Sequence, residues 1–388
     1  MVTDRGSVPI IHWLEDGKAF EARWRSHSGS PPPARIIVAD GRMTADEAYG
    51  LACQGTALLW RGDFQDARQM LTALGKRADR RKGRAQGSTA TSPVDPAEAF
   101  HLYRQARSQR ARTLNALLIP LNDDYSIPLP RAPDIRQACE EAYGAAETAS
   151  VTSLRALLGV VGAHEWRRKG IEIPEAGGRI HPHYGVFAPI RREYVDLVST
   201  TPLPAACASA SLAFDIGTGT GVLAAVLARR GVQRVIATDL DLRALACARE
   251  NVRQLGLLDR VEVVQADLFP EGRAALVLCN PPWIPARPSS SMEGGIYDPD
   301  SRMLRGFLRA LPDHLEPGGE AWLILSDLAE HLGLRTRAQL LEEFATAGLR
   351  VLGRGDVPPR HPRAADESDV LHHARAAEIT SLWRLGAD

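Results

Sequence analysis

The chain has 388 residues, of which 44% are hydrophobic, and its 47 basic residues are matched by 47 acidic ones. This length and apolar content predict two or three globular domains with ordinary cores. The zero net charge argues against a protein that lives on nucleic acid. No apolar run approaches the roughly 18 residues that a membrane-spanning helix needs.

The N-terminal stretch has no basic region followed by a long apolar core, so we expect no signal peptide. The five cysteines are scattered and form no C-x-x-C pair, which is typical of buried thiols in a reducing compartment. We therefore expect a cytoplasmic protein that does not enter a membrane. The sequence leaves the oligomeric state open.

Helical patterns dominate the first half of the chain. The sequence T-A-D-E at Thr44–Glu47 is a capping box, and D-P-A-E at Asp95–Glu98 combines a cap with proline at the first helical position. Between these two helix starts, Gly, Ser and Thr are frequent over about 82–94, which predicts a linker. The predicted helices run from Thr44 toward Trp60 and over 63–80, 95–118, 133–143 and 152–168.

The strongest local charge excess lies at residues 76–112, where ten basic residues face three acidic ones. The first interpretation is a solvated helix face followed by a basic linker. The alternative is a surface for RNA, a ribosome or an acidic protein.

The second half alternates between short apolar runs and helical patterns. This alternation predicts a parallel sheet with helices on both faces, and a domain boundary near 175–185. Two closing strands are expected after it, over 349–357 and 377–385. The other predicted strands cover 211–217, 234–239, 261–267, 274–280 and 320–326, and the predicted helices cover 220–230, 241–255 and 301–315.

The first of these strands ends in a glycine loop, D-I-G-T-G-T-G-V, with glycines at positions 217, 219 and 221. Glycine allows a tight turn and a close approach of the backbone to a ligand, because no Cβ intervenes. A dinucleotide fingerprint would place its third glycine at position 222, which is Val222 here. An NAD site is therefore disfavoured.

Polar residues end the next three strands, in the order Asp239, Asp267 and Asn280. Asp239 stands about where a carboxylate would bind ribose hydroxyls, and Asp267 about where one would accept a hydrogen from an adenine amine. Either aspartate alone would more simply be a helix N-cap. Three successive strand ends of this kind instead favour a ligand site at the carboxyl edge of the sheet.

After Asn280 the chain continues as Pro281, Pro282 and Trp283, and the prolines end the pairing of the strand. The side-chain carbonyl of Asn280 and the backbone carbonyl of Pro281 can hold both N–H bonds of a planar NH2 group. The nitrogen lone pair then points to a methyl donor, and Trp283 can stack on the acceptor. A turn after a buried strand is the simpler alternative. Cys279 is expected to be a packed thiol.

Residues 180–388 resemble a class I S-adenosylmethionine-dependent methyltransferase, because the glycine loop, the two aspartates and N-P-P-W follow in that family's order and spacing. The N-P-P-aromatic subset contains release-factor glutamine methyltransferases, and DNA and RNA methyltransferases that act on exocyclic amines. Residues 184–198 are similar to the I-P-R-P-E-T-E-x-L-V stretch of the glutamine methyltransferases, without its second proline and threonine. Trp283 stands where those enzymes usually carry tyrosine.

The resemblance implies a Rossmann-like α/β domain over 180–388, with a seven-stranded, mostly parallel sheet whose last strand is antiparallel. A mainly helical domain over 1–179 would precede it and dock the substrate. The cofactor would be S-adenosylmethionine, and no metal is implied. The cofactor-binding residues would be Phe187, Asp215, Gly217, Thr218, Gly219, Gly221, Asp239, Asp267, Leu268 and Asn280, and the catalytic residues Asn280, Pro281 and Trp283.

The acceptor best supported by the resemblance is a protein glutamine, in a release-factor-like or ribosomal partner. An RNA or DNA base is the alternative. A small-molecule acceptor, or an inactive module that only binds the cofactor, comes next. The two histidines of I-H-P-H-Y at 180–184 are expected to pack or to line the rim of the site, since no third metal ligand has matching spacing.

Overall fold

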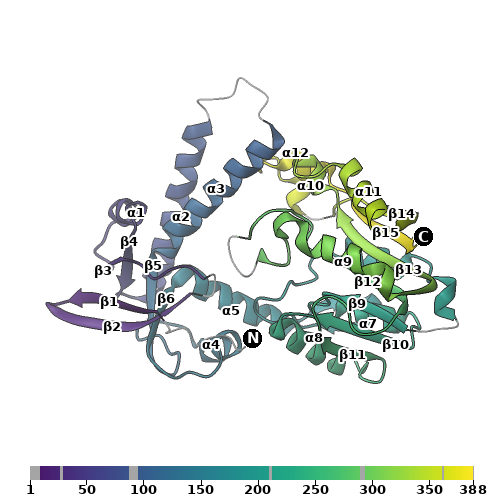
Figure 1. Cartoon of the computed structure of the whole chain (residues 1–388). Coiled ribbons are helices and arrows are strands. Elements are labelled where there is room, and N and C mark those ends of the chain that lie inside the picture. The colour runs from purple at the N-terminus through teal and green to yellow at the C-terminus, as the bar shows by residue number, and fades with distance from the viewer. Residues whose placement is uncertain are drawn as a thin grey trace. The chain divides into compact units, whose positions relative to one another are not determined.

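The computed structural model describes residues 9–26, 29–86, 95–208, 212–288, 293–360 and 362–387. The chain divides into two compact units (Figure 1). Unit 1 comprises Met1–Val94 and His101–Glu165, and unit 2 comprises Asp95–Phe100 and Trp166–Asp388.

Unit 1 contains a six-stranded sheet in the order β1-β2-β6-β5-β4-β3. In it, β2–β6, β3–β4 and β4–β5 pair in parallel, and β1–β2 and β5–β6 pair antiparallel. The strands are β1 (Ile10–Glu15), β2 (Lys18–Arg25), β3 (Arg35–Ala39), β4 (Thr56–Trp60), β5 (Leu117–Leu121) and β6 (Ser150–Ser153). The helices are α1 (Ala45–Cys53), α2 (Phe64–Gln86), α3 (Pro96–Asn115), α4 (Arg136–Tyr143) and α5 (Leu154–Lys169), of which α3 and α5 extend into unit 2.

The expectation of a mainly helical first half missed this sheet. Strands β4 and β5 are T-A-L-L-W and L-L-I-P-L, and every residue in them is buried. A strand covered on both faces shows no alternation of apolar and polar residues, so its sequence is hard to distinguish from the end of the preceding helix. The helix predicted toward Trp60 therefore stops at Cys53, and the one predicted to 118 stops at Asn115.

The helix starts in unit 1 agree with the sequence. Thr44 caps α1, and its side chain accepts the Glu47 N–H at 3.3 Å. Helix α2 continues to Gln86, so the first part of the predicted linker is helical. The rest of that linker, 87–94, lies outside the described residues.

Unit 2 is built on a seven-stranded sheet in the order β11-β10-β9-β12-β13-β15-β14. The last strand, β15, runs antiparallel to β13 and β14, as predicted. The strands are β9 (Leu212–Ile216), β10 (Arg234–Asp239), β11 (Val261–Gln265), β12 (Ala274–Cys279), β13 (Leu315–Ser326), β14 (Leu349–Val357) and β15 (Thr380–Ala387). The helices are α6 (Glu193–Thr200), α7 (Val222–Arg229), α8 (Leu242–Gln254), α9 (Arg302–His314), α10 (Leu328–His331), α11 (Arg337–Thr346) and α12 (His372–Ala377).

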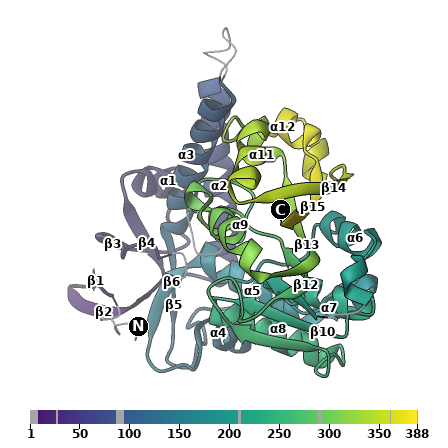
Figure 2. The ribbon, with the colours of Figure 1, turned by 45° about the vertical axis from the view of Figure 1, so that its right-hand side comes forward.

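Alternate residues of the central strands enter two separate cores. Leu276 and Leu278 of β12 pack with α6 and α7, whereas Val277 and Cys279 pack with α9 and α11. Helices thus cover both faces of the sheet (Figure 2), which confirms the Rossmann-like fold. Since successive side chains of a strand point to opposite faces, β12 can be apolar throughout and wholly buried.

The boundary between the units lies at residues 165 and 166 rather than at the predicted 179 and 180. The segment between them forms the hairpin of β7 (Ile171–Ile173) and β8 (Gly178–Ile180), joined by a short turn of 3₁₀ helix. Ile173 and Ile180 are fully buried in the core that contains α7. That hairpin is therefore part of the second unit, although its sequence resembles a linker.

Within the described ranges, the structure contains no helix long and apolar enough to span a bilayer.

Candidate active site

The glycine loop between β9 and α7 requires its glycines. Gly217, Gly219 and Gly221 have φ values of 70°, 55° and 79°, which side chains rarely adopt. A Cβ on Gly217 would lie 2.7 Å from Cε of Met303, whereas a Cβ on Gly219 would meet nothing within 4 Å. The loop is thus closely packed at its base and open at Gly219, where a ligand can approach the backbone.

Asp215 supports this loop from inside the protein. Its side chain is 1% exposed. Its Oδ2 accepts the Thr218 hydroxyl at 2.6 Å and the Ala224 N–H of α7 at 3.1 Å. Burial, opposed in part by these two bonds, raises the pKa of Asp215 to about 6. The structure therefore places Asp215 beneath the loop, where it holds the shape of the turn.

Asp239 lies at the end of β10, beside the same loop. Its Oδ2 accepts the Gly219 N–H at 3.0 Å, and its Oδ1 accepts the Asp241 N–H at 3.0 Å. Burial raises the pKa of this carboxyl as well. The adjacent strand ends of β9 and β10 are thereby joined through one carboxylate.

The third predicted strand end is more open. Asp267 is exposed and makes no hydrogen bond to another described residue. Leu268 follows it with a φ of 71°, an uncommon value for a branched residue. Its carbonyl accepts the Thr238 hydroxyl at 2.6 Å, so this turn is tied to β10. Asp267 is therefore presented to solvent on a fixed backbone.

Asn280 directly follows the buried strand β12, which pairs with β9. The indole N–H of Trp283 donates to its Oδ1 at 2.9 Å. Because an indole nitrogen is a donor only, this bond also fixes which atom of the amide is the oxygen. The backbone carbonyl of Pro281 accepts no hydrogen bond from the described part of the chain. The proposed stacking role of Trp283 stays a prediction, and the structure adds a contact with Asn280.

Two further residues, Arg191 and Glu378, lie near Trp283 and carry no signal in the sequence. Arg191 places its guanidinium carbon 5.6 Å from the centroid of the Trp283 ring. Both of its terminal nitrogens bind the carboxylate of Glu378, at 2.9 and 2.8 Å. Nothing in the sequence links residues that are 187 positions apart, so only the fold brings them together.

A buried asparagine on α8 was also missed. The Nδ2 of Asn251 donates to the Thr220 carbonyl of the glycine loop at 3.0 Å, and its Oδ1 accepts the His181 N–H at 2.7 Å. His183 contacts Glu250 of the same helix at 2.6 Å. The I-H-P-H-Y segment is thus packed on α8, as predicted, and it reaches the loop through Asn251.

Phe187 and Cys279 complete the predicted set. Phe187 is 42% exposed. A Cβ built on Gly295 would lie 3.0 Å from the Cβ of Phe187, so Phe187 borders the segment that follows N-P-P-W. Cys279 is a fully buried free thiol, and burial raises its pKa well above the ordinary value. The expected packed thiol is confirmed.

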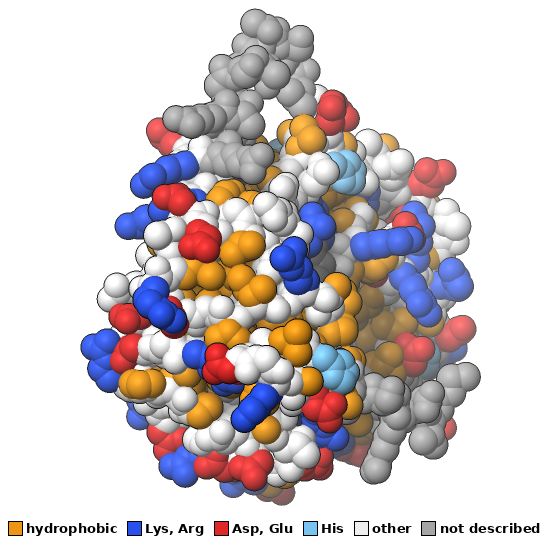
Figure 3. All heavy atoms as spheres, turned by 90° about the vertical axis from the view of Figure 1, so that its left-hand side faces the viewer, with side chains coloured by type: hydrophobic (Ala, Val, Ile, Leu, Met, Phe, Trp, Pro, Cys, Tyr) orange, Lys and Arg blue, Asp and Glu red, His pale blue; other side chains and the backbone are white. Residues whose placement is uncertain are grey.

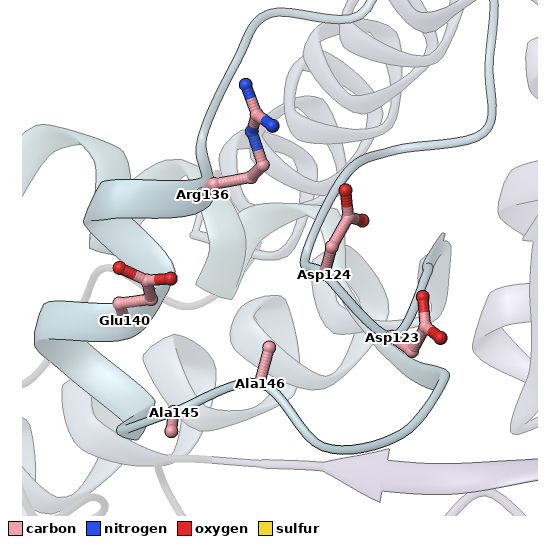
Figure 4. A pocket seen from close by; sticks show the side chains of 6 residues that line it. All are labelled: Asp123, Asp124, Arg136, Glu140, Ala145 and Ala146. Atoms are coloured by element: carbon pink, nitrogen blue, oxygen red, sulfur yellow. The ribbon is translucent and has the colours of Figure 1, made fainter.

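Unit 1 contains a hollow of about 710 Å³, which has neither a glycine loop nor a row of polar strand ends. Figure 4 shows Asp123 and Asp124 on one loop, facing Arg136 and Glu140 of α4. Asp124 is already bonded to Ser126, and Arg136 to Asp134. Two of the four charged residues that line the hollow thus have partners within their own turns, and the carboxyl edge in unit 2 is the better candidate.

Part of the chain is similar to known proteins. Residues 178–349 match the model of the "Methyltransferase small domain" family. The release factor glutamine methyltransferase of Cereibacter sphaeroides is 37% identical over 153 residues, which cover 36% of this chain and 53% of that protein. The tRNA1(Val) (adenine(37)-N6)-methyltransferase of Shewanella loihica is 29% identical over 204 residues, which cover 49% of this chain and 79% of that protein.

The ribosomal protein L11 methyltransferase of Pelotomaculum thermopropionicum is 46% identical over 69 residues, or 17% of this chain and 22% of that protein. A solved ribosomal protein L11 methylase from Lactobacillus delbrueckii aligns with a TM-score of 0.32 and 16% identity, covering 46% of this chain and 70% of that one. The chain spans about half the length of the first curated relative, 53% of it.

Proposed function

We propose that this chain, whose residues 178–349 match the model of the "Methyltransferase small domain" family, transfers a methyl group from S-adenosylmethionine to a planar nitrogen. The observation that carries the proposal is the amide of Asn280. It stands at the end of β12 beside the strand that ends in the glycine loop, and its oxygen is fixed by Trp283.

The residues at the carboxyl edge fit the cofactor. The open side of Gly219 would admit its methionine end, together with Gly217, Thr218, Gly221 and Phe187. Asp239 would bind the ribose hydroxyls, and Asp267 and Leu268 would border the adenine. S-adenosylmethionine would supply an electrophilic methyl group on a sulfonium sulfur. Asp215 would act indirectly, through the shape of the loop that it holds.

Two carbonyls would prepare the acceptor. The lone pair of an amide or aromatic amine is delocalised, so it must be turned out of conjugation before it can attack. Asn280 Oδ1 and the Pro281 carbonyl would each accept one N–H of the NH2 group and leave the lone pair directed at the methyl carbon. Oδ1 has two lone pairs, so it can serve Trp283 and the acceptor together. The carbonyls also stabilise the positive charge that develops on nitrogen.

A glutamine side chain of a protein is the acceptor we favour. The similarity to release factor glutamine methyltransferase and the loose match of residues 184–198 both support it. The partner would then be a release-factor-like or ribosomal protein. We expect a cytoplasmic protein on the strength of its five free cysteines.

An RNA base is the second candidate, because three arginines gather in unit 1. Arg107 and Arg110 of α3 lie close enough to Arg155 of α5 for their charges to act on it, and Arg155 is exposed. Of these three, Arg110 is paired with Asp79 at 2.8 Å. On the face of the molecule in Figure 3, basic and acidic side chains are interspersed, so a site for phosphates would have to be local. A small-molecule acceptor or an inactive cofactor-binding module is the remaining alternative.

The test uses S-adenosylmethionine labelled in its methyl group. Purified protein is added to an extract of cells that lack it, and the products are divided between nuclease and protease. We expect label that protease releases and nuclease does not. Label released by nuclease would instead make a base the acceptor, and Arg107, Arg110 and Arg155 would then be the residues to substitute in search of a phosphate-binding surface.

The matched control is Asn280→Ala in the same extract. We expect it to bind the cofactor with nearly unchanged affinity and to lose about 100- to 1,000-fold in transfer rate. Asp239→Ala should have the opposite pattern, with weakened cofactor binding first. Unchanged transfer by Asn280→Ala would overturn the mechanism, and an unchanged dissociation constant for Asp239→Ala would contradict the ribose assignment.

A further inference from the structure

We propose that Arg191 and Glu378 are positioning residues for methyl transfer, which hold the indole of Trp283 and, through it, the amide of Asn280. This inference rests on the proposed function and adds to it two residues that do not touch the acceptor.

The contacts form one continuous chain. Trp283 is held at its edge, where its N–H donates to Asn280 Oδ1 at 2.9 Å. It is also held by the guanidinium of Arg191, whose carbon lies 5.6 Å from the ring centroid. A cation within about 6 Å of an indole face is attracted to the ring. The indole therefore has little freedom to rotate, and the amide oxygen that it contacts is fixed with it.

Arg191 is itself fixed by a buried carboxylate. Glu378 is 1% exposed and accepts from both terminal nitrogens of Arg191, at 2.9 and 2.8 Å. The Ser326 hydroxyl donates to the same carboxylate at 2.6 Å. A planar guanidinium bound through two parallel bonds has a defined orientation as well as a defined position. Segments around residues 191, 283, 326 and 378 thus meet at the end of β13.

The positive charge of Arg191 also has to be neutralised, because the proposed reaction places another positive charge nearby. The proposed reaction brings a cationic sulfonium next to Asn280, and the positive charge then passes to the acceptor nitrogen. An uncompensated guanidinium nearby would oppose both states, because like charges in a partly buried site repel strongly. Glu378 cancels that charge. Arg191 can therefore hold the indole without disfavouring the cofactor.

The test compares Glu378→Gln, Arg191→Gln and the double variant with the wild type. For each protein, the rate of label transfer in the extract is measured, and calorimetry gives the dissociation constants of S-adenosylmethionine and of S-adenosylhomocysteine, which lacks the sulfonium charge. Arg192→Gln is the matched control, because this neighbouring arginine is paired with Glu175 at 3.2 Å and is half exposed.

We expect Glu378→Gln to slow transfer and to weaken the binding of S-adenosylmethionine relative to S-adenosylhomocysteine by about tenfold, because it leaves Arg191 charged without the carboxylate that binds both of its terminal nitrogens. The double variant should return that affinity ratio to the wild-type value and still transfer slowly, since the indole is no longer held. Arg192→Gln should change neither quantity. A wild-type rate and a wild-type ratio in Glu378→Gln would overturn the proposal.

Arg191→Lys covers the case in which the neutral variants do not fold. Lysine keeps the charge and cannot form two parallel bonds, so the transfer rate should fall while the affinity ratio stays near that of the wild type. A wild-type rate in this variant would also contradict the proposal. Failure of the proposed function is distinguishable, because the wild type itself would then bind the cofactor and label no component of the extract.

Discussion

In unit 1, the charged residues that follow strand β4 are bonded to partners on other segments, whereas in unit 2 two polar groups that follow β11 and β12 have no partner among the described residues. After β4, Arg61 binds Glu15 at 2.7 Å, and Asp63 binds Arg131 at 2.6 Å. After β11 and β12, the Asp267 side chain and the Pro281 carbonyl have no bond to a described residue.

The two sheets have similar interiors, since β4, β5 and β12 are wholly buried and, apart from Thr56, apolar. At the strand ends, unit 2 thus differs from unit 1 in having two polar groups available to a ligand, next to Asp239 and Asn280, which already have partners. Three predictions test this difference, and they follow in order of decreasing effect.

Substitution of a glycine should weaken cofactor binding in the loop of unit 2 and should stabilise the fold in a helix of unit 1. Gly217→Val in the loop combines a φ of 70° with a Cβ only 2.7 Å from Met303, so the loop must move. We expect the cofactor dissociation constant to rise by about 100-fold or more, since a displacement of about 1 Å can cost that much. Gly162→Ala in α5 meets nothing within 4 Å. It should leave binding unchanged and stabilise unit 1 by about 0.4–1 kcal/mol.

Calorimetric titration and urea unfolding measure the two effects. Equal affinities for Gly217→Val and the wild type would show that the loop does not approach the cofactor.

Asp215 should make stability depend on pH. Its pKa rises from 3.8 in the unfolded chain to about 6 in the folded protein. Its contribution to folding is therefore fully present below the unfolded pKa and is lost as the pH rises through the folded one. The loss amounts to about 3 kcal/mol at most. Asn at this position keeps an acceptor for Thr218 and does not titrate.

The measurement is urea unfolding of both proteins at about pH 4 and about pH 7. The stability of Asp215→Asn relative to the wild type should increase with pH. A difference between the two proteins that is the same at both pH values would refute the assignment.

The smallest effect is expected for Glu15→Gln in unit 1. The Glu15 and Arg61 side chains are 22% and 30% exposed, so solvent screens their attraction. We expect a loss of about 0.5–1 kcal/mol, reduced by added salt. Bonds to Arg61 lower the pKa of Glu15, so its contribution is present at neutral pH and is lost as the pH falls through the folded pKa. Cofactor affinity should not change; a change there would assign these strand ends a role in the site.

The sequence was sufficient to predict unit 2 and insufficient to predict unit 1. Alternating strands and helices with glycine, aspartate and asparagine at the strand ends identify a parallel sheet with a site at one edge. The strands β4 and β5 carry no such pattern, because both of their faces are buried. The residues around the site divide in the same way. Asn280 and the glycines belong to local motifs, whereas Arg191, Asn251 and Glu378 become neighbours of the site only through the tertiary fold.

Strand β15 lies between β13 and β14, although both precede it in the chain. During synthesis, β13 and β14 must therefore wait with unpaired edges until residues 380–387 have left the ribosome, and such edges are prone to wrong pairing. Glu378 stands just before β15, so the counter-ion of Arg191 also arrives last. A nascent chain that stops short of this strand would contain the glycine loop but an incomplete sheet.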